Sequence, residues 1–196
     1  MRTLGVFCGS CIGNRPEYQN AAVELGLLMA RENIALVFGG GKVGMMGIIA
    51  TTVLEHGGKV TGVITRDLNE MGLALSGWPG QLEMIVTETL ALRKQRMFEL
   101  SDGFMALAGG FGTLDEIFEA VTCTQLHVHA KPCGMLNTCG FYDNLLGQIS
   151  VFFNHGFIGD NHISMLASDS SPGSLLEKMR AYRHEDGGTC IGKKGD

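Results

Sequence analysis

Short runs of apolar residues alternate with longer amphipathic stretches along most of the chain. Glycine, proline or polar residues flank the apolar runs, a pattern typical of buried strands. These predicted strands occupy residues 3–8, 34–38, 59–64, 82–86, 103–107, 132–136 and 164–167. The periodicity between them predicts helices over residues 16–31, 45–56, 88–101, 113–126, 142–154 and 173–183.

The alternation of strand and helix predicts an α/β fold. Continuously apolar strands are typical of a parallel sheet that is buried on both faces. We therefore expect a Rossmann-like, doubly wound parallel sheet with helices on both faces and ligand sites at the carboxyl ends of its strands. The length fits a single nucleotide-binding domain over residues 1–183, followed by a flexible tail over 184–196. One long irregular connection, residues 65–81, is either a lid or an ordinary loop.

Composition narrows the choice of partners. Apolar residues make up 45% of the chain and charged residues 18%, with a net charge of −5. No basic stripe precedes the tail, which argues against nucleic acid as a partner. No stretch reaches the roughly 18 apolar residues of a membrane span, and the first residues do not resemble a signal peptide, so we expect a cytoplasmic protein that does not enter membranes. The apolar surplus hints at an oligomer.

Several cysteine and histidine residues are candidate metal ligands. Cys8 and Cys11 form a C-x-x-C pair, which is read either as a redox or metal motif or as a strand end followed by a small loop residue. The second interpretation is favoured because no second pair completes a zinc set. His127 and His129 lack a third partner in the sequence and are assigned to a helix end. We therefore expect no metal.

Two glycine-rich segments follow predicted strands and open predicted helices. The first is GGGKVGMMG at residues 39–47 and the second is AGGFGTLDE at residues 108–116. Glycine lets backbone N–H groups approach an anion, and a helix N-terminus adds partial positive charge. Neither segment matches the P-loop or the G-x-G-x-x-G fingerprint, which argues against NAD. The two loops together predict a nucleotide phosphate site, with binding residues Ser10, Gly40, Gly41, Gly109, Gly110, Gly112 and Thr113.

Arg93 and Lys94 lie early in the helix that precedes the second glycine-rich loop. An ordinary solvated helix face is the simpler interpretation for Lys94. If the helix begins near Thr87 or Thr89, however, Arg93 lies at the edge of the site. A guanidinium at that position could bind a phosphate with two hydrogen bonds.

In combination, GGGxxGxMG, RK and GGxGTxxE resemble the LOG (Lonely Guy) family of cytokinin riboside 5′-monophosphate phosphoribohydrolases, long labelled lysine decarboxylases. The resemblance covers residues 1–180 and includes TxxQL, which begins at Thr122, and KPCGMLNTCGFYDNLL. It implies a homodimer without a cofactor that hydrolyses the N-glycosidic bond of AMP or a cytokinin riboside monophosphate. It also implies catalytic roles for Arg93 and Glu116, and substrate binding by Lys94, Gly109–Thr113 and Thr122.

Three departures from the family pattern concern the base pocket. The chain has Ala108 where the family has proline, Leu90-Ala91 where it has Met-His, and Cys123 where it often has tryptophan. These departures leave the base preference open.

Three alternatives remain beside this hypothesis. Thr113 to Glu116 matches the capping box T-x-x-E, which needs no catalysis. A decarboxylase would need pyridoxal phosphate on Lys42 or Lys94, the only lysines near the loops. A nucleotide or cofactor carrier could use the same fold without turnover.

Overall fold

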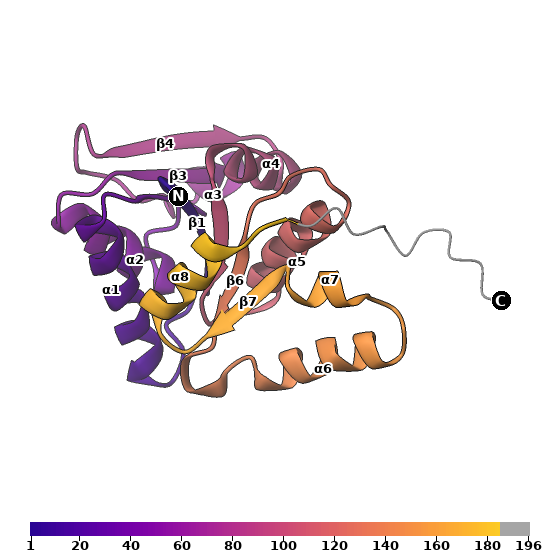
Figure 1. Cartoon of the computed structure of the whole chain (residues 1–196). Coiled ribbons are helices and arrows are strands. Elements are labelled where there is room, and N and C mark those ends of the chain that lie inside the picture. The colour runs from indigo at the N-terminus through magenta and orange to yellow at the C-terminus, as the bar shows by residue number, and fades with distance from the viewer. Residues whose placement is uncertain (185–196) are drawn as a thin grey trace.

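The computed structural model describes residues 1–184 of the chain (Figure 1). The rest of the predicted tail, residues 185–196, lies outside the described residues. His184, the first residue of that predicted tail, accepts or donates hydrogen bonds with His127 and Tyr182.

A single parallel sheet forms the centre of the molecule. Its seven strands lie in the order β4-β3-β2-β1-β5-β6-β7, and every neighbouring pair is parallel. The strands are β1 (Thr3–Phe7), β2 (Ala35–Phe38), β3 (Val60–Thr65), β4 (Leu82–Thr87), β5 (Gly103–Ala106), β6 (Cys133–Leu136) and β7 (Leu166–Asp169). Each crossover between parallel strands contains helix, as this connection requires.

Helices cover both faces of the sheet. They are α1 (Pro16–Arg31), α2 (Gly44–Glu55), α3 (Arg66–Glu70), α4 (Leu90–Leu100), α5 (Phe111–Gln125), the 3₁₀ turn η1 (Thr138–Gly140), α6 (Asp143–Asn154), α7 (Asp160–Ile163) and α8 (Pro172–Ala181). One apolar core lies under α1, α2 and α8, and a second lies under α4 and α5 (Figure 1). The doubly wound α/β prediction is confirmed. Within residues 1–184, no helix is long and apolar enough to cross a membrane.

All seven predicted strands and six predicted helices are present, with shifts at their ends. The last strand lies two residues later than predicted, over Leu166–Asp169. Helix α5 begins at Phe111 rather than at residue 113. The short helices α3 and α7 were not predicted, because four or five residues carry too little periodicity to be recognised.

The sheet reverses its winding direction between β1 and β5. From β1 the chain builds β2, β3 and β4 outward on one side, whereas β5, β6 and β7 extend on the other. The loops after β1 and β5 therefore separate at the carboxyl edge and leave a crevice, where open α/β sheets bind ligands. The Gly9 N–H donates to the Ala108 carbonyl at 3.1 Å, which fixes the two loops against each other.

The long connection between β3 and β4 folds against the first glycine-rich loop. Gly41 forms an isolated antiparallel bridge with Ala74. The Leu75 N–H donates to Gly40 at 2.9 Å, and the Lys42 N–H donates to Leu73 at 2.9 Å. These contacts hold the connection against the loop, and none of residues 65–81 lines the two hollows described below.

Candidate active site

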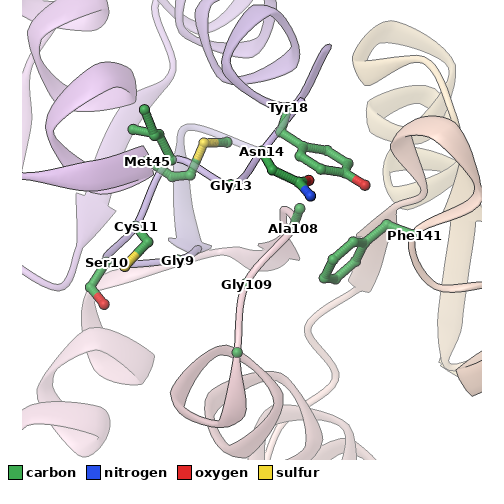
Figure 2. Close-up of a pocket in the computed structure, with 12 residues that line it drawn as sticks. Gly9, Ser10, Cys11, Gly13, Asn14, Tyr18, Met45, Ala108, Gly109 and Phe141 are labelled. Atoms are coloured by element: carbon green, nitrogen blue, oxygen red, sulfur yellow. The ribbon is translucent and has the colours of Figure 1, made fainter. Parts of the chain in front are cut away.

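Two adjoining hollows lie at the crevice, each of roughly 350 Å³. The first, which we call the carboxylate hollow, is lined among others by Gly39, Met46, Arg93, Gly112, Thr113 and Glu116. The second, which we call the aromatic hollow, is lined among others by Cys11, Ile12, Asn14, Tyr18, Met45 and Phe141 (Figure 2). Gly9, Ser10 and Gly110 line both. The crevice at the switch point of the sheet is therefore divided into two hollows that share three residues.

A buried ion pair forms the floor of the carboxylate hollow. Arg93 donates from Nη1 to Glu116 Oε1 at 2.9 Å, and the side chains of both residues are only 11% exposed. Arg93 also donates from Nε to the Val63 carbonyl at 2.9 Å. These contacts hold the guanidinium from two directions, so it presents a fixed positive charge beside the carboxylate.

The position of Arg93 follows from two local features. Helix α4 begins at Leu90, and the hydroxyl of its N-cap Thr89 accepts from the Leu92 N–H at 3.2 Å. This start confirms the predicted one and places Arg93 in the first turn. Gly39 permits the close approach of Arg93, because a methyl group on Gly39 would overlap the guanidinium.

Burial decides the electrostatics of Glu116. Loss of solvation raises the pKa of Glu116 above its ordinary value, and the charge and hydrogen bond of Arg93 oppose this rise. Glu116 is the sixth residue of α5, beyond the first turn in which the helix dipole is felt. The N-terminus of α5 therefore contributes little to the ionisation of Glu116, and Arg93 is the group that favours the charged form.

The capping-box interpretation is also wrong. Gly110 is the N-cap of α5, because its carbonyl accepts from the Leu114 N–H at 3.1 Å and its backbone is extended. Thr113 is thus the third residue inside the helix and cannot act as its N-cap. Helix capping therefore does not explain why a glutamate is buried at position 116.

The N-terminus of α5 opens into the crevice. A methyl group on Gly110 or Gly112 would meet no atom within 4 Å, so the space beside both residues is open. Gly109 differs, because a side chain there would overlap the buried Thr113. The first amides of a helix have no acceptor within the helix, so this end offers N–H groups and partial positive charge to an anion.

The first glycine-rich loop contributes fewer residues to the lining of the hollows than predicted. Gly39 and Met46 line the carboxylate hollow, but Gly40 and Gly41 lie behind it and do not. The Lys42 N–H already donates to Leu73, and the Met45 N–H donates to Gly9 at 3.0 Å. Of the two loops, the second therefore offers the more open helix end.

Two further predicted binding residues lie outside both hollows. Lys94 forms ion pairs with Asp115 at 2.8 Å and with Glu119 on helix α5. Thr122 is exposed in the last turn of α5, three turns from the open N-terminus. The predicted residues that the structure brings together in the carboxylate hollow are Ser10, Arg93, Gly110, Gly112, Thr113 and Glu116. Gly109 lines the aromatic hollow.

Cysteine and histidine residues form no metal cluster in residues 1–184. Cys8 follows β1 and is buried, whereas Cys11 is exposed in the next loop, and both are free thiols. His129 Nδ1 lies 3.3 Å from Thr124 Oγ1 at the end of α5, and His127 Nδ1 lies 2.8 Å from His184 Nε2. The histidines thus belong to the end of α5, as predicted.

Sequence reasoning missed the walls of the aromatic hollow. Asn14 and Tyr18 lie in a segment with no recognised motif. Phe141 lies within the quoted run KPCGMLNTCGFYDNLL but was given no role in the site, and it is about 125 residues from the β1 loop that it faces. Gly39 was also missed, although the position of its triplet directly after β2 was a usable signal.

Comparison with known proteins identifies the same region of the chain. A family model described as "Possible lysine decarboxylase" matches residues 46–179. Cytokinin riboside 5′-monophosphate phosphoribohydrolase LOG1 of Arabidopsis thaliana is 40% identical over 187 residues, covering 94% of this chain and 86% of the relative. The enzyme LOG of Oryza sativa subsp. japonica is 38% identical over 182 residues, covering 92% and 74%.

Solved structures share the fold at lower identity. The molybdenum cofactor binding protein of Rippkaea orientalis superimposes with a TM-score of 0.67 at 23% identity, covering 91% of this chain and 95% of that one. The Moco carrier protein of Chlamydomonas reinhardtii gives a TM-score of 0.64 at 18% identity, covering 91% and 97%. These likenesses concern the fold. The sequence matches and the conjunction of the Arg93–Glu116 pair with the open glycine-rich helix end lead to one conclusion: the chain belongs to the LOG family of cytokinin riboside 5′-monophosphate phosphoribohydrolases.

Proposed function

We propose that this protein hydrolyses the N-glycosidic bond of a nucleoside 5′-monophosphate, AMP or a cytokinin riboside monophosphate, to the free base and ribose 5-phosphate. The observation that carries the proposal is the buried Arg93–Glu116 pair directly below the open N-terminus of α5. The names of the curated relatives support the same reaction class.

The 5′-phosphate binds at the N-terminus of α5. The open spaces beside Gly110 and Gly112 leave room for phosphate oxygens, and the amides of the first turn supply donors. Glu116 lies one helical turn below Thr113, a rise of roughly 4.5 Å along the helix axis. A ribose that is anchored through its phosphate therefore extends toward the Glu116 carboxylate.

Glu116 supplies the negative charge that the reaction needs. Departure of the base leaves positive charge on the ribose ring, which a fixed carboxylate stabilises. Water then forms a bond to C1′ and loses a proton to the Glu116 carboxylate. The base leaves with the electron pair of the broken C1′–N bond and takes up a proton.

Arg93 orients this carboxylate and favours its ionised form against the effect of burial. Its Nη1 donates to one carboxylate oxygen, so the second oxygen remains for the ribose or water. Removal of one partner from a buried pair leaves the other charge without compensation, at a cost of roughly 3–5 kcal/mol. Arg93 also brings positive charge close to the phosphate.

Base release from AMP and from adenosine tests the proposal. Wild-type protein is incubated with each compound, and free adenine and ribose 5-phosphate are separated by chromatography. We expect AMP to be cleaved and adenosine to be left intact, because the phosphate supplies the anchoring contacts. Equal rates for the two compounds would show that the helix end is not a phosphate site. A panel of nucleoside monophosphates then determines the base preference.

We also propose a homodimer. A groove between α4 and α5, lined among others by Leu92, Phe98, Cys123 and Val128, leaves apolar side chains exposed on the sheet face that α1 and α2 do not cover. Exposed apolar patches of this kind mark interfaces. A second copy of this chain is the partner that the family resemblance implies.

We assign the protein to the cytoplasm. The five cysteines within residues 1–184 are all free thiols, as expected in a reducing compartment.

Two other functions fit less well. A carrier on this fold needs a pocket but not a buried carboxylate paired with arginine, and it would bind AMP without releasing adenine. A decarboxylase needs a lysine available for pyridoxal phosphate. Lys94 Nζ is occupied by Asp115 and Glu119 instead.

A further inference from the structure

The aromatic hollow has no part in the reaction proposed above. Figure 2 shows Tyr18 and Phe141 along one side of it, with Met45 and Cys11 on the other and the loop to α5 below. The rings of Tyr18 and Phe141 meet edge to face, with centroids 5.5 Å apart. Phe141 is 41% exposed and Ile12 is 45% exposed, so apolar surface is left open to a ligand.

The Phe141 wall is built rigidly. The neighbouring Tyr142 is buried and donates from its hydroxyl to the Leu107 carbonyl at 2.6 Å. The Tyr142 N–H donates to Asn137 Oδ1, and Asn137 Nδ2 donates to Asp143 Oδ1, both at 2.7 Å. The turn between Asn137 and Asp143 is thereby fixed on both sides. Phe141 is therefore held in place at the hollow and is not a loose surface ring.

The opposite segment brings a polar group to the same space. Tyr18 extends from α1, and the left-handed Gly13 packs against its ring, where a methyl group would lie 2.9 Å from Cδ2. Asn14 is exposed, and it lines the same hollow as Tyr18 and Ala108 (Figure 2). An amide can both donate to and accept from the edge of a heterocycle. Two rings and one carboxamide form a suitable surface for a planar group.

The position of this hollow determines what the planar group is attached to. Both hollows meet at Gly9, Ser10 and Gly110, beside the helix end where the phosphate is placed. If the nucleoside occupies the carboxylate hollow, the aromatic hollow lies on the other side of that phosphate. No acidic side chain among the described residues lines it, so a second phosphate would meet no repulsion there.

We propose that the aromatic hollow binds a second planar ring joined through the phosphate, so that the protein accepts pyrophosphate-linked dinucleotides as ligands in a site that lacks the G-x-G-x-x-G fingerprint of NAD-binding loops. This inference rests on the proposed function for the placement of the first nucleoside. It gives a role to two segments that the nucleotide monophosphate does not need, the loop around Asn14 and the turn that carries Phe141.

A matched pair of ligands isolates the second ring. Diadenosine pyrophosphate carries a second adenine, whereas ADP-ribose has the same pyrophosphate and second ribose without that base. We expect wild-type protein to bind diadenosine pyrophosphate about five- to tenfold more tightly than ADP-ribose in calorimetry, the range expected for ring stacking. In Phe141→Leu and Tyr18→Leu the ratio should fall to about one. The control Phe157→Leu, at an exposed phenylalanine outside both hollows, should keep the wild-type ratio.

Three results would overturn the inference. The first is a wild-type ratio near one, and the second is a ratio that both variants leave unchanged. The third is a loss of AMP affinity in the two variants as large as their loss of affinity for diadenosine pyrophosphate. That result would assign the hollow to the base of AMP itself. The protein could also fail to cleave AMP while the affinity ratio of the two ligands still depends on Tyr18 and Phe141. That result would overturn the proposed reaction and uphold this inference.

Discussion

At the residue scale, the central feature is a contact between two side chains that are 23 positions apart in sequence. The sequence indicated that Arg93 and Glu116 both belong to the site, through the motifs that contain them. It could not show that they touch, because that depends on the start of α4 and on the missing side chain at Gly39. Nor could it exclude the capping box, since Thr113 to Glu116 satisfies the pattern and only the helix start at Phe111 removes it.

The ionisation of Glu116 should depend on Arg93. Burial raises the pKa of Glu116, and Arg93 is the largest influence that lowers it. In Arg93→Met the pKa should therefore rise further, so that the carboxylate takes up its proton at a higher pH than in wild type. The titration of the Glu116 carboxyl carbon by NMR, assigned by its loss in Glu116→Gln, measures this shift.

Arg96→Met is the matched control for this titration. Arg96 lies on the same helix but pairs with Glu99 on the surface, so its loss should leave the Glu116 titration in place. An unchanged or lower midpoint in Arg93→Met would show that the two side chains do not share this contact in solution.

At the element scale, some glycines make room for neighbouring protein atoms and others face open space. The glycine content of the two loops alone does not distinguish these two roles. The glycines in the first loop accommodate nearby protein atoms. Gly44, for example, has φ of +65°, and a side chain there would overlap the Ser10 carbonyl. Gly110 and Gly112 at α5 face open space. Both loops are rich in glycine, because close approach of a backbone and close approach of a ligand call for the same residue.

Paired alanine substitutions separate these two roles. Gly112→Ala should leave the melting temperature unchanged or slightly higher, because alanine favours helix and meets no atom. Its methyl group enters the phosphate space, so the KM for AMP should rise about tenfold, the loss of one charge-assisted contact. Thermal melts and steady-state kinetics measure the two effects.

Gly44→Ala should behave in the opposite way. The left-handed backbone and the overlap with Ser10 should lower the free energy of unfolding by about 1–3 kcal/mol or more. A destabilised Gly112→Ala with normal KM, or a Gly44→Ala of normal stability, would contradict this division of the glycines.

The elements themselves were largely predictable, and the errors have a common cause. Strands such as β5 and β6 are buried throughout and appear as plain apolar runs. Helices α3 and α7 are too short to show a period. The aromatic hollow could not be predicted, because Tyr18 and Phe141 meet only after β1 and β6 take their places in the sheet.

At the scale of the whole molecule, the two faces of the sheet differ in how completely they are covered. The groove between α4 and α5 leaves Leu92 47% exposed and Val128 70% exposed. The open end of α5 belongs to the same helix pair. Helices α4 and α5 thus line both the groove and the carboxylate hollow, through different residues.

Gel filtration tests this interface. Wild-type protein should elute near twice 21.0 kDa, and Leu92→Asp and Val128→Asp should elute as folded monomers, because a charge cannot be buried at an apolar contact without a partner. Leu27→Asp, at a leucine of similar exposure on α1, should remain dimeric. A wild-type monomer at micromolar concentration, or dimers in both groove variants, would contradict this interface.

The most direct test of the account is adenine release from AMP by wild type and by Glu116→Gln. Glutamine preserves the shape and can still accept from Arg93, but it lacks the charge that stabilises the ribose ring. We predict that the variant folds and binds AMP while adenine release falls by about two orders of magnitude or more. Asp115→Asn, an adjacent and exposed carboxylate on the same helix, should stay within about twofold of wild type. Normal turnover by Glu116→Gln would contradict the mechanism.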